Sequence, residues 1–255
     1  MASKTIISFL RSLHQKKFRL EHGLFLVEGP KMVNELLHSE FEVGQIYATN
    51  DWEIPSGLKD VKVEIITNKE LDQVSAMQTP HKVLATVKIP VTHAQLPLPK
   101  QGLHLLVDHI QDPGNLGTII RIADWFGCSS ICCSPDTVDL FNPKVVQATM
   151  GSIFRVGVYY GSLPDLLINN AAAGKLPVYA TLLEGESVYS QEITNDGFII
   201  LGNESKGMNP LLMPFVSAAI RIPSASPSKN KAESLNVAIA TGIICAEFRR
   251  QFPLK

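Results

Sequence analysis

The strongest constraint on the fold is a regular alternation of short apolar runs and helix-like segments from residue 103 onwards. Runs of the kind that form buried strands lie at residues 103–107, 130–134, 178–182, 198–201 and 218–222. Segments with apolar residues at helical spacing follow most of them, and the last extends from residue 233 to about residue 250. Strands that alternate with helices predict an α/β fold with a mostly parallel sheet.

The first hundred residues predict a separate, smaller α/β domain. Strands are expected at residues 23–28, 43–48, 61–66 and 82–89, and Thr67 and Glu70 have the spacing of a capping box at the start of a helix. Residues 90–102 contain three prolines and have the composition of a linker. We therefore divide the chain into a domain of residues 1–95 and a domain of residues 102–255.

Residues 1–20 predict one amphipathic helical segment with a basic polar side. No acidic residue occurs in this stretch, whose basic residues are Lys4, Arg11, Lys16, Lys17 and Arg19. Such residues form either an ordinary solvated surface or a set of contacts to nucleic-acid phosphates. The pattern alone favours the solvated surface.

Composition excludes several classes of protein. The net charge of −1 does not favour nucleic-acid binding through total charge, although a local basic face remains compatible with it. No apolar run is long enough to span a membrane, and the amino terminus lacks a signal peptide's apolar stretch. Four cysteines do not make a disulfide framework in a chain of 255 residues, and no histidine accompanies Cys132 and Cys133 in a metal site. We expect a cytoplasmic protein without a membrane segment or a metal ion.

Three polar loops follow predicted strands and contain the candidate site. They lie at residues 112–121, 202–207 and 222–236. Gly202 and Gly207 have the glycine spacing of a Walker A loop, but Met208 and Asn209 stand where Lys and Ser or Thr are required. No G-x-G-x-x-G or G-x-S-x-G sequence follows a strand, so neither an NAD-type Rossmann site nor an ordinary serine hydrolase is indicated.

The sequences of these loops resemble the three motifs of the SpoU (TrmH-like) branch of the SPOUT RNA methyltransferases. The first motif corresponds to Asp112-Pro113-Gly114-Asn115-Leu116-Gly117-Thr118 with Arg121, the second to Leu201-Gly202-Asn203-Glu204-x-x-Gly207, and the third to Ile222-Pro223 with Glu233-Ser234-Leu235-Asn236-Val237. Three motifs in this order are highly specific. The link from Ser224 to Ala232 departs from the family pattern, because it is longer than is typical and contains Lys229 and Lys231.

Residues 20–95 are similar to the small substrate-binding domain that often precedes this catalytic domain, most clearly at Phe25-Leu26-Val27-Glu28-Gly29. The resemblance implies a SPOUT domain with a C-terminal trefoil knot, a preceding L30e-like α/β domain that binds RNA, and a homodimer. It also implies S-adenosylmethionine as the cofactor. The implied reaction is methylation of a ribose 2′-hydroxyl in structured RNA, with rRNA favoured over tRNA.

The resemblance also implies roles for individual residues. The catalytic set is Arg121, Asn115, Glu204, Ser234 and Asn236. The cofactor would be held, mainly through backbone groups, by Thr181, Leu182, Leu201, Gly202, Ile222 and Leu235. The predicted RNA-binding set is separate from the motifs and consists of the basic residues of the amino-terminal segment, because their charge suits contacts to phosphates: Lys4, Arg11, Lys16, Lys17 and Arg19. We expect Arg121 to clamp the target phosphate and stabilise the developing alkoxide, because a guanidinium is not deprotonated in proteins and is a poor base.

Structural interpretations of the same residues stay open at this stage. Arg121 could form a surface pair with Asp124, Asn115 or Ser234 could be a helix cap, and Glu204 could be a solvated loop acid. For the whole protein, the alternatives are a catalytically inactive RNA-binding protein of the same fold and a SPOUT enzyme that methylates a nucleobase.

Overall fold

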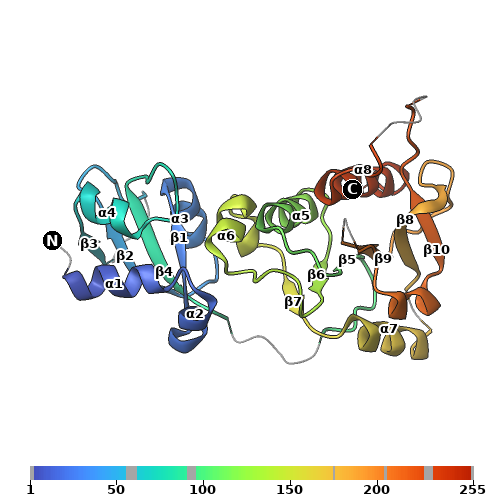
Figure 1. Ribbon diagram of the computed structural model, residues 1–255, viewed down its shortest axis with the longest axis horizontal. Coiled ribbons are helices and arrows are strands. Elements are labelled where there is room, and N and C mark those ends of the chain that lie inside the picture. The colour runs from blue at the N-terminus through green and yellow to red at the C-terminus, as the bar shows by residue number, and fades with distance from the viewer. Residues whose placement is uncertain are drawn as a thin grey trace. The chain divides into compact units, whose positions relative to one another are not determined.

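The computed structural model describes residues 3–55, 62–90, 96–174, 176–203, 206–226 and 232–253 (Figure 1). Its contacts divide the chain into two compact units. Met1–Val91 and Asp139–Arg155 form the first unit, and Thr92–Val138 and Val156–Lys255 form the second. This differs in one respect from the division made on the sequence, because residues 139–155 pack with the amino-terminal elements. There the ring of Phe141 lies 4.6 Å from the ring of Phe25.

The first unit contains a four-stranded sheet in the order β1-β4-β2-β3. Its strands are β1 (Leu24–Glu28), β2 (Val43–Ala48), β3 (Val63–Ile65) and β4 (Val83–Lys88), and only the β2–β3 pairing is parallel. The helices α1 (Lys4–Ser12) and α4 (Asn68–Val74) share a core with the sheet, to which Leu10, Leu71 and Leu84 contribute. The predicted capping box at Thr67 and Glu70 is present. The helix α3 (Pro30–Leu37) packs on β1 and β4, whereas α6 (Pro143–Thr149), which η1 (Ser152–Phe154) follows, packs on β1.

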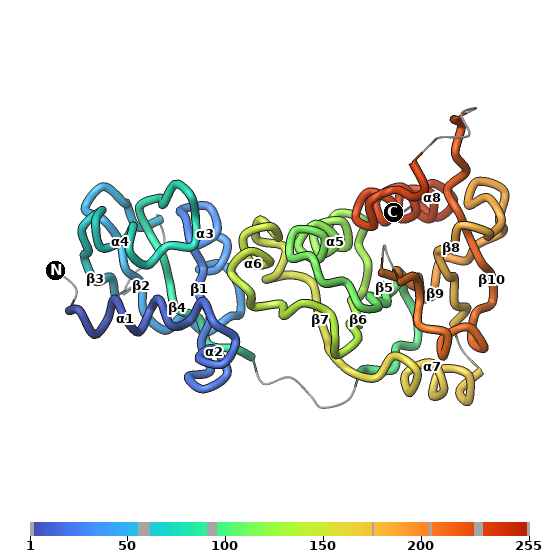
Figure 2. The backbone as a smooth tube through the Cα atoms, in the orientation of Figure 1, coloured from blue at the N-terminus to red at the C-terminus, as the bar shows by residue number. Residues whose placement is uncertain are grey.

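The basic segment at the amino terminus is two helices, not the single helix predicted from its pattern. The helix α1 ends at Ser12, and α2 (Lys16–His22) begins after a break (Figure 2). The guanidinium of Arg19 donates to the carbonyl oxygens of Leu13 and His14 at 2.9 and 2.8 Å, so it satisfies carbonyl groups at the break. Because an unpaired buried carbonyl is costly, these bonds help to hold the break.

The second unit contains a six-stranded sheet in the order β10-β8-β9-β5-β6-β7. The strands are β5 (Leu103–Val107), β6 (Ser130–Cys133), β7 (Val158–Tyr160), β8 (Val178–Ser187), β9 (Gly197–Leu201) and β10 (Ala218–Arg221). Every pairing between these described strands is parallel, which confirms the predicted parallel sheet. The three-residue strand β7 was not predicted, because so short a run gives little periodic signal.

Helices cover both faces of this sheet, as expected for a parallel sheet. The helix α7 (Leu163–Ala172) and the 3₁₀ segment η2 (Pro210–Phe215) pack on the face that carries Leu106 and Ile200. On the other face, Phe248 of α8 (Val237–Gln251) makes an edge contact with Tyr179. The helix α5 (Pro113–Trp125) lies beside α8 (Figure 1). Cys132 and Cys133 are buried in β6, and burial raises the pKa of the Cys132 thiol to about 11. Within the described parts of the chain, we find no helix long and apolar enough to cross a membrane.

Candidate active site

The three motif loops leave the sheet at the same edge. They follow the carboxyl ends of β5, β9 and β10, and parallel strands present these ends on one side of a sheet. In spatial order only β8 stands between β10 and β9, and β9 is next to β5. Segments far apart in the sequence are therefore neighbours at this edge, where open α/β sheets bind their ligands.

The first and third motifs are joined by a hydrogen bond between two predicted catalytic residues. The side-chain amide of Asn236 donates to Oδ1 of Asn115 at 2.9 Å, across 121 positions of sequence. Neither the Asn115 nor the Ser234 cap interpretation holds. Asp112 caps α5, by accepting from the Asn115 amide at 2.8 Å, and Asn236 caps α8. Ser234 is exposed and makes no hydrogen bond to any described residue.

Arg121 lies on α5, six residues after Asn115, or roughly 9 Å further along the helix axis. Its side chain is exposed, and it forms no hydrogen bond or ion pair with a described residue. The surface pair with Asp124 is therefore not formed. The structure gives Arg121 no packing role, and its guanidinium is available to a ligand.

The second motif forms a tight loop after β9. The backbone groups of Asn203 and Gly207 bond to each other in both directions, at 3.0 and 2.9 Å. A Cβ atom at position 202 would lie 2.9 Å from the carbonyl carbon of Gly207, so the loop closes only with glycine at 202. The predicted catalytic residue Glu204 lies outside the described residues, as does most of the long link that includes Lys229 and Lys231.

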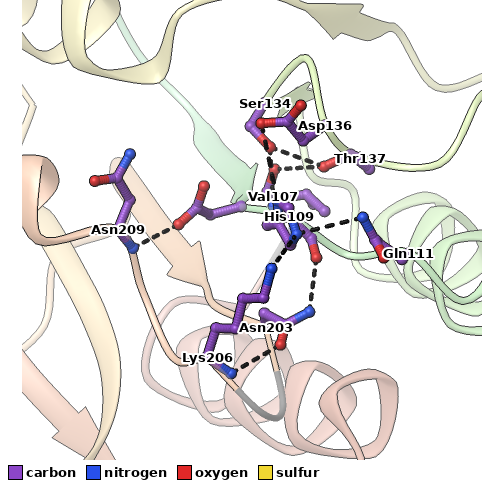
Figure 3. A network of polar contacts seen from close by, with 10 residues as sticks. Val107, His109, Gln111, Ser134, Asp136, Thr137, Asn203, Lys206 and Asn209 are labelled. Atoms are coloured by element: carbon purple, nitrogen blue, oxygen red, sulfur yellow. Dashed lines mark hydrogen bonds and ion pairs between the residues drawn. The ribbon is translucent and has the colours of Figure 1, made fainter.

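A polar network that sequence reasoning missed connects this loop to the loops after β5 and β6 (Figure 3). The side-chain amide of Asn203 donates to the carbonyl of His109 at 2.9 Å, and the His109 amide donates to Oγ of Ser134 at 2.8 Å. One step earlier, a carboxylate oxygen of Asp108 accepts from the backbone amide of Asn209 at 2.7 Å. The only sequence signal was a polar run directly after an apolar strand.

The segments predicted to hold the cofactor lie within β8, at and directly after the end of β9, directly after β10, and before α8. The strand β8 pairs with β9 only as far as Ala180, and its pairing with β10 skips from Ala180 to Glu186. Thr181 and Leu182 lie in the intervening stretch, where the Thr181 hydroxyl donates to the carbonyl of Ile200 at 2.8 Å. Gly202 directly follows β9 and Ile222 directly follows β10. Leu201 is buried, Ile222 is half-buried and Leu235 is exposed.

The predicted RNA-binding residues do not all share one environment. Lys4, Arg11, Lys16 and Lys17 are exposed, and Lys4 and Arg11 line a cavity of about 390 Å³ between α1 and α4. Arg19 does not belong with them. It is 2% exposed, and its guanidinium forms an ion pair with Asp139 at 2.6 Å, in addition to its two bonds to backbone carbonyls. Its charge is neutralised by Asp139 within the first unit.

Comparison with known families decides the relationship. The profile of the SpoU rRNA Methylase family matches residues 102–246, and that of the MRM3-like substrate binding domain matches residues 4–85. The chain belongs to the SpoU rRNA methylase family. The family and the α/β fold predicted from the three motifs are therefore confirmed, and the match at residues 4–85 covers the region in which a substrate-binding domain was predicted.

Three proteins are similar to this SpoU chain over nearly its whole length. The 23S rRNA (guanosine(2553)-2′-O)-methyltransferase RlmP of Bacillus subtilis is 32% identical over 241 residues, which are 94% of each chain. A TrmH-family protein of Porphyromonas gingivalis superposes with a TM-score of 0.86 at 36% identity, over 98% of this chain and 99% of that one. An AdoMet-bound rRNA methyltransferase from Sinorhizobium meliloti has a TM-score of 0.84 at 29% identity, over 100% of this chain and 98% of that one.

Proposed function

We propose that this protein transfers a methyl group from S-adenosylmethionine to a ribose 2′-hydroxyl of ribosomal RNA. The observation that carries the proposal is the bond between Asn236 and Asn115. It brings two motif residues together at the first turn of α5, the helix that bears Arg121. A chain that used this fold only to bind RNA would have no need of such an arrangement on the same helix as an exposed arginine that pairs with none of the described residues.

The residues at this edge fit the cofactor. Bound S-adenosylmethionine would supply an electrophilic methyl group on its sulfonium. The backbone of Leu201 and Gly202 and the apolar side chains of Ile222 and Leu235 would hold the nucleoside part. Glycine at 202 is required by the close approach of the second-motif backbone, because a Cβ atom there would lie 2.9 Å from the carbonyl carbon of Gly207.

The protein's own contribution to the reaction is orientation and charge. Asn115 and Asn236 would orient the ribose through their amide groups. Holding the 2′-oxygen in line with the methyl group lowers the activation barrier, because the reactants are already positioned. Arg121 would grip the adjacent phosphate and stabilise negative charge as it develops on the 2′-oxygen. Because guanidinium stays protonated, a phosphate oxygen or a water molecule would accept the proton.

Two similarities support ribosomal RNA and ribose chemistry. The relative from Bacillus subtilis carries a 23S rRNA 2′-O activity in its name, and the amino-terminal residues match a substrate-binding domain. We propose that Lys4, Arg11, Lys16 and Lys17 contribute RNA affinity, because they are exposed on consecutive helices. Mapping methylated riboses in rRNA from cells with and without this protein tests the substrate, and an unchanged map would contradict the proposal.

We further propose a homodimer, a trefoil knot and a cytoplasmic location, where ribosomes are assembled. Trp125 at the end of α5 is 84% exposed and Ile239 on the adjoining α8 is 57% exposed, which is the kind of surface that a second copy would cover. The return of α8 onto α5 after the 222–236 loop is compatible with a knot. Light scattering, experimental tracing of the chain and cell fractionation test the three statements in turn.

The decisive variant for the activity is Arg121→Lys. Lysine keeps the charge but lacks the planar fork that can hold a phosphate and an alkoxide together. We expect single-turnover methylation of rRNA to fall by about a hundredfold or more, the effect of losing about 3 kcal/mol of transition-state stabilisation. The melting temperature should not change, because Arg121 is exposed and has no partner among the described residues.

Arg250→Lys is the matched control. Arg250 is also an exposed helical arginine, but it pairs with Glu247 on its own helix. We expect this variant to methylate at the wild-type rate. A loss of less than about tenfold in Arg121→Lys, or an equal loss in both variants, would remove Arg121 from the reaction.

A further inference from the structure

His109 has a backbone conformation that few residues other than glycine adopt. Its φ is 59°, and it stands two positions after the end of β5. A left-handed backbone at a non-glycine residue is uncommon, persists only where surrounding contacts enforce it, and is found preferentially at functional sites. Here the enforcing contacts are the bond from its amide to Ser134 and the bond to its carbonyl from Asn203. His109 therefore links the loops after β5, β6 and β9.

The imidazole of His109 faces two donors on one side and a carboxylate on the other (Figure 3). Its Nε2 lies 3.3 Å from Nζ of Lys206 and 3.3 Å from Nε2 of Gln111, and its Nδ1 lies 3.9 Å from a carboxylate oxygen of Asp136. An ammonium group can only donate, so Nε2 must be the acceptor in the contact with Lys206. The proton of the neutral ring then sits on Nδ1, on the side of Asp136.

Lys206 is held at both ends. Its backbone amide donates to Oδ1 of Asn203 at 2.9 Å, within the second-motif loop. Its ammonium group contacts Nε2 of the His109 ring. The residue is exposed, and among the described residues no carboxylate lies within ion-pairing distance of Nζ. The result is an oriented positive charge, with no negative partner in the described part of the chain, at the edge where the three motifs meet.

We propose that Lys206 binds a phosphate of the RNA substrate and that His109 is a positioning residue, which orients the ammonium group before the RNA arrives. This inference rests on the proposed function. Phosphate is the ligand whose chemistry fits, because a lysine acts on it as a point charge and has two N–H donors left once one of its three donates to the ring of His109. Preorganisation by His109 would reduce the rotamer entropy that a free lysine loses on binding.

The test measures RNA affinity in variants of the intact protein, with an unmodified large-subunit rRNA transcript as the probe. Lys206→Met should raise the Kd by about tenfold, the effect of one lost charge-assisted contact, and should reduce the slope of log Kd against log salt concentration by about 1. Lys206→Arg should restore most of the affinity. Lys100→Met is the matched control, because Lys100 is an exposed lysine before the amino-terminal end of β5, at the opposite edge of the sheet.

The role of His109 is tested by His109→Gly, which accepts the left-handed backbone and keeps both backbone bonds. We expect about a threefold rise in Kd and in the KM for RNA, with kcat changed less than twofold and the melting temperature not lowered. In the double variant with Lys206→Met, the histidine change should have no further effect on Kd. His109→Asn, which also tolerates this backbone, is the second variant.

The outcomes separate this inference from the proposed function. If the wild-type protein binds the transcript but Lys206→Met leaves both Kd and the salt slope unchanged, the phosphate contact is refuted while the proposed function stands. If the two changes are additive, His109 does not act through Lys206. If S-adenosylmethionine affinity falls and RNA affinity does not, Lys206 belongs to the cofactor pocket. If the wild-type protein neither binds nor methylates the RNA, the proposed function itself fails.

Discussion

Asn236 makes two kinds of contact that substitutions can separate. Its Oδ1 caps α8 by accepting from the backbone amides of Ala238 and Ile239, at 3.0 and 3.3 Å, and its amide nitrogen donates to Asn115 at 2.9 Å. Asn236→Ala removes both contacts. Asn236→Asp keeps an acceptor for the cap and adds a negative charge at the helix amino terminus, which is favourable, but it loses the donor to Asn115.

The two contacts have comparable expected magnitudes. Loss of a cap typically costs about 1 kcal/mol, and loss of one hydrogen bond between side chains costs about 1 kcal/mol. Asn236→Ala should therefore lower the free energy of unfolding by about 2 kcal/mol, which corresponds to a fall in melting temperature of about 4–8 °C in a chain of this size. Asn236→Asp should lose about half as much. Both should slow methyl transfer, because Asn115 is no longer oriented.

Urea unfolding and calorimetry measure the stability, and single-turnover methylation measures the rate. Asn142 provides the matched control, because it caps α6 by accepting from the amide of Lys144 at 2.9 Å. There Asp should restore the whole stability that Ala removes. If Asn236→Asp is as stable as the wild type, the bond to Asn115 contributes nothing to folding. If it is as unstable as Asn236→Ala, the cap contributes nothing. Either result would refute the reasoning.

Two further predictions concern the first unit and the amino-terminal edge of the larger sheet. Neutralising Lys4, Lys16 and Lys17 should flatten the salt dependence of RNA binding without affecting stability. Arg19→Met should instead lower the free energy of unfolding by about 3 kcal/mol, because it breaks a buried ion pair. Salt titrations and urea unfolding of the two variants distinguish these effects, and the reverse pattern would contradict the assignment. Burial lowers the pKa of His104, whose ring bonds to Ser130 and Gln101, so the unfolded chain binds a proton more readily than the folded chain. Stability should therefore decline as the pH falls below about 6.5. This decline should be smaller in His104→Gln when unfolding is followed between pH 8 and pH 5, and an identical pH profile would refute it.

Where a structural feature depends on neighbouring residues, the sequence was sufficient to predict it. The bounds of β2 and β5 agree with the strands predicted at 43–48 and 103–107, and the Thr67–Glu70 capping box is present. Periodicity and capping involve residues a few positions apart, so their signal is complete in a short window. The three loops were also identified from the sequence as following predicted strands, and the parallel sheet places them at one edge.

The amino-terminal helices show where local reasoning fails. The sequence pattern places arginines of an amphipathic helix on its exposed side, and Arg19 was therefore predicted to contact RNA. In the structure Arg19 bonds to the carbonyl groups at the break after α1 and pairs with Asp139, which is 120 positions away in the sequence. That partner comes from the segment 139–155, which packs with the first unit, and no window of sequence contains both residues.

The sequence by itself determined the fold class, the family and the three loops of the candidate site, because these depend on periodicity and on motifs that are continuous in the chain. Only the tertiary structure decided which hydrogen bonds the side chains of these loops form. Asp112 caps α5, which leaves the side chain of Asn115 to bond with Asn236. The left-handed backbone of His109 depends on hydrogen bonds from Asn203 and to Ser134. Such contacts arise only when folding brings distant loops together, so their geometry is a property of the packed molecule.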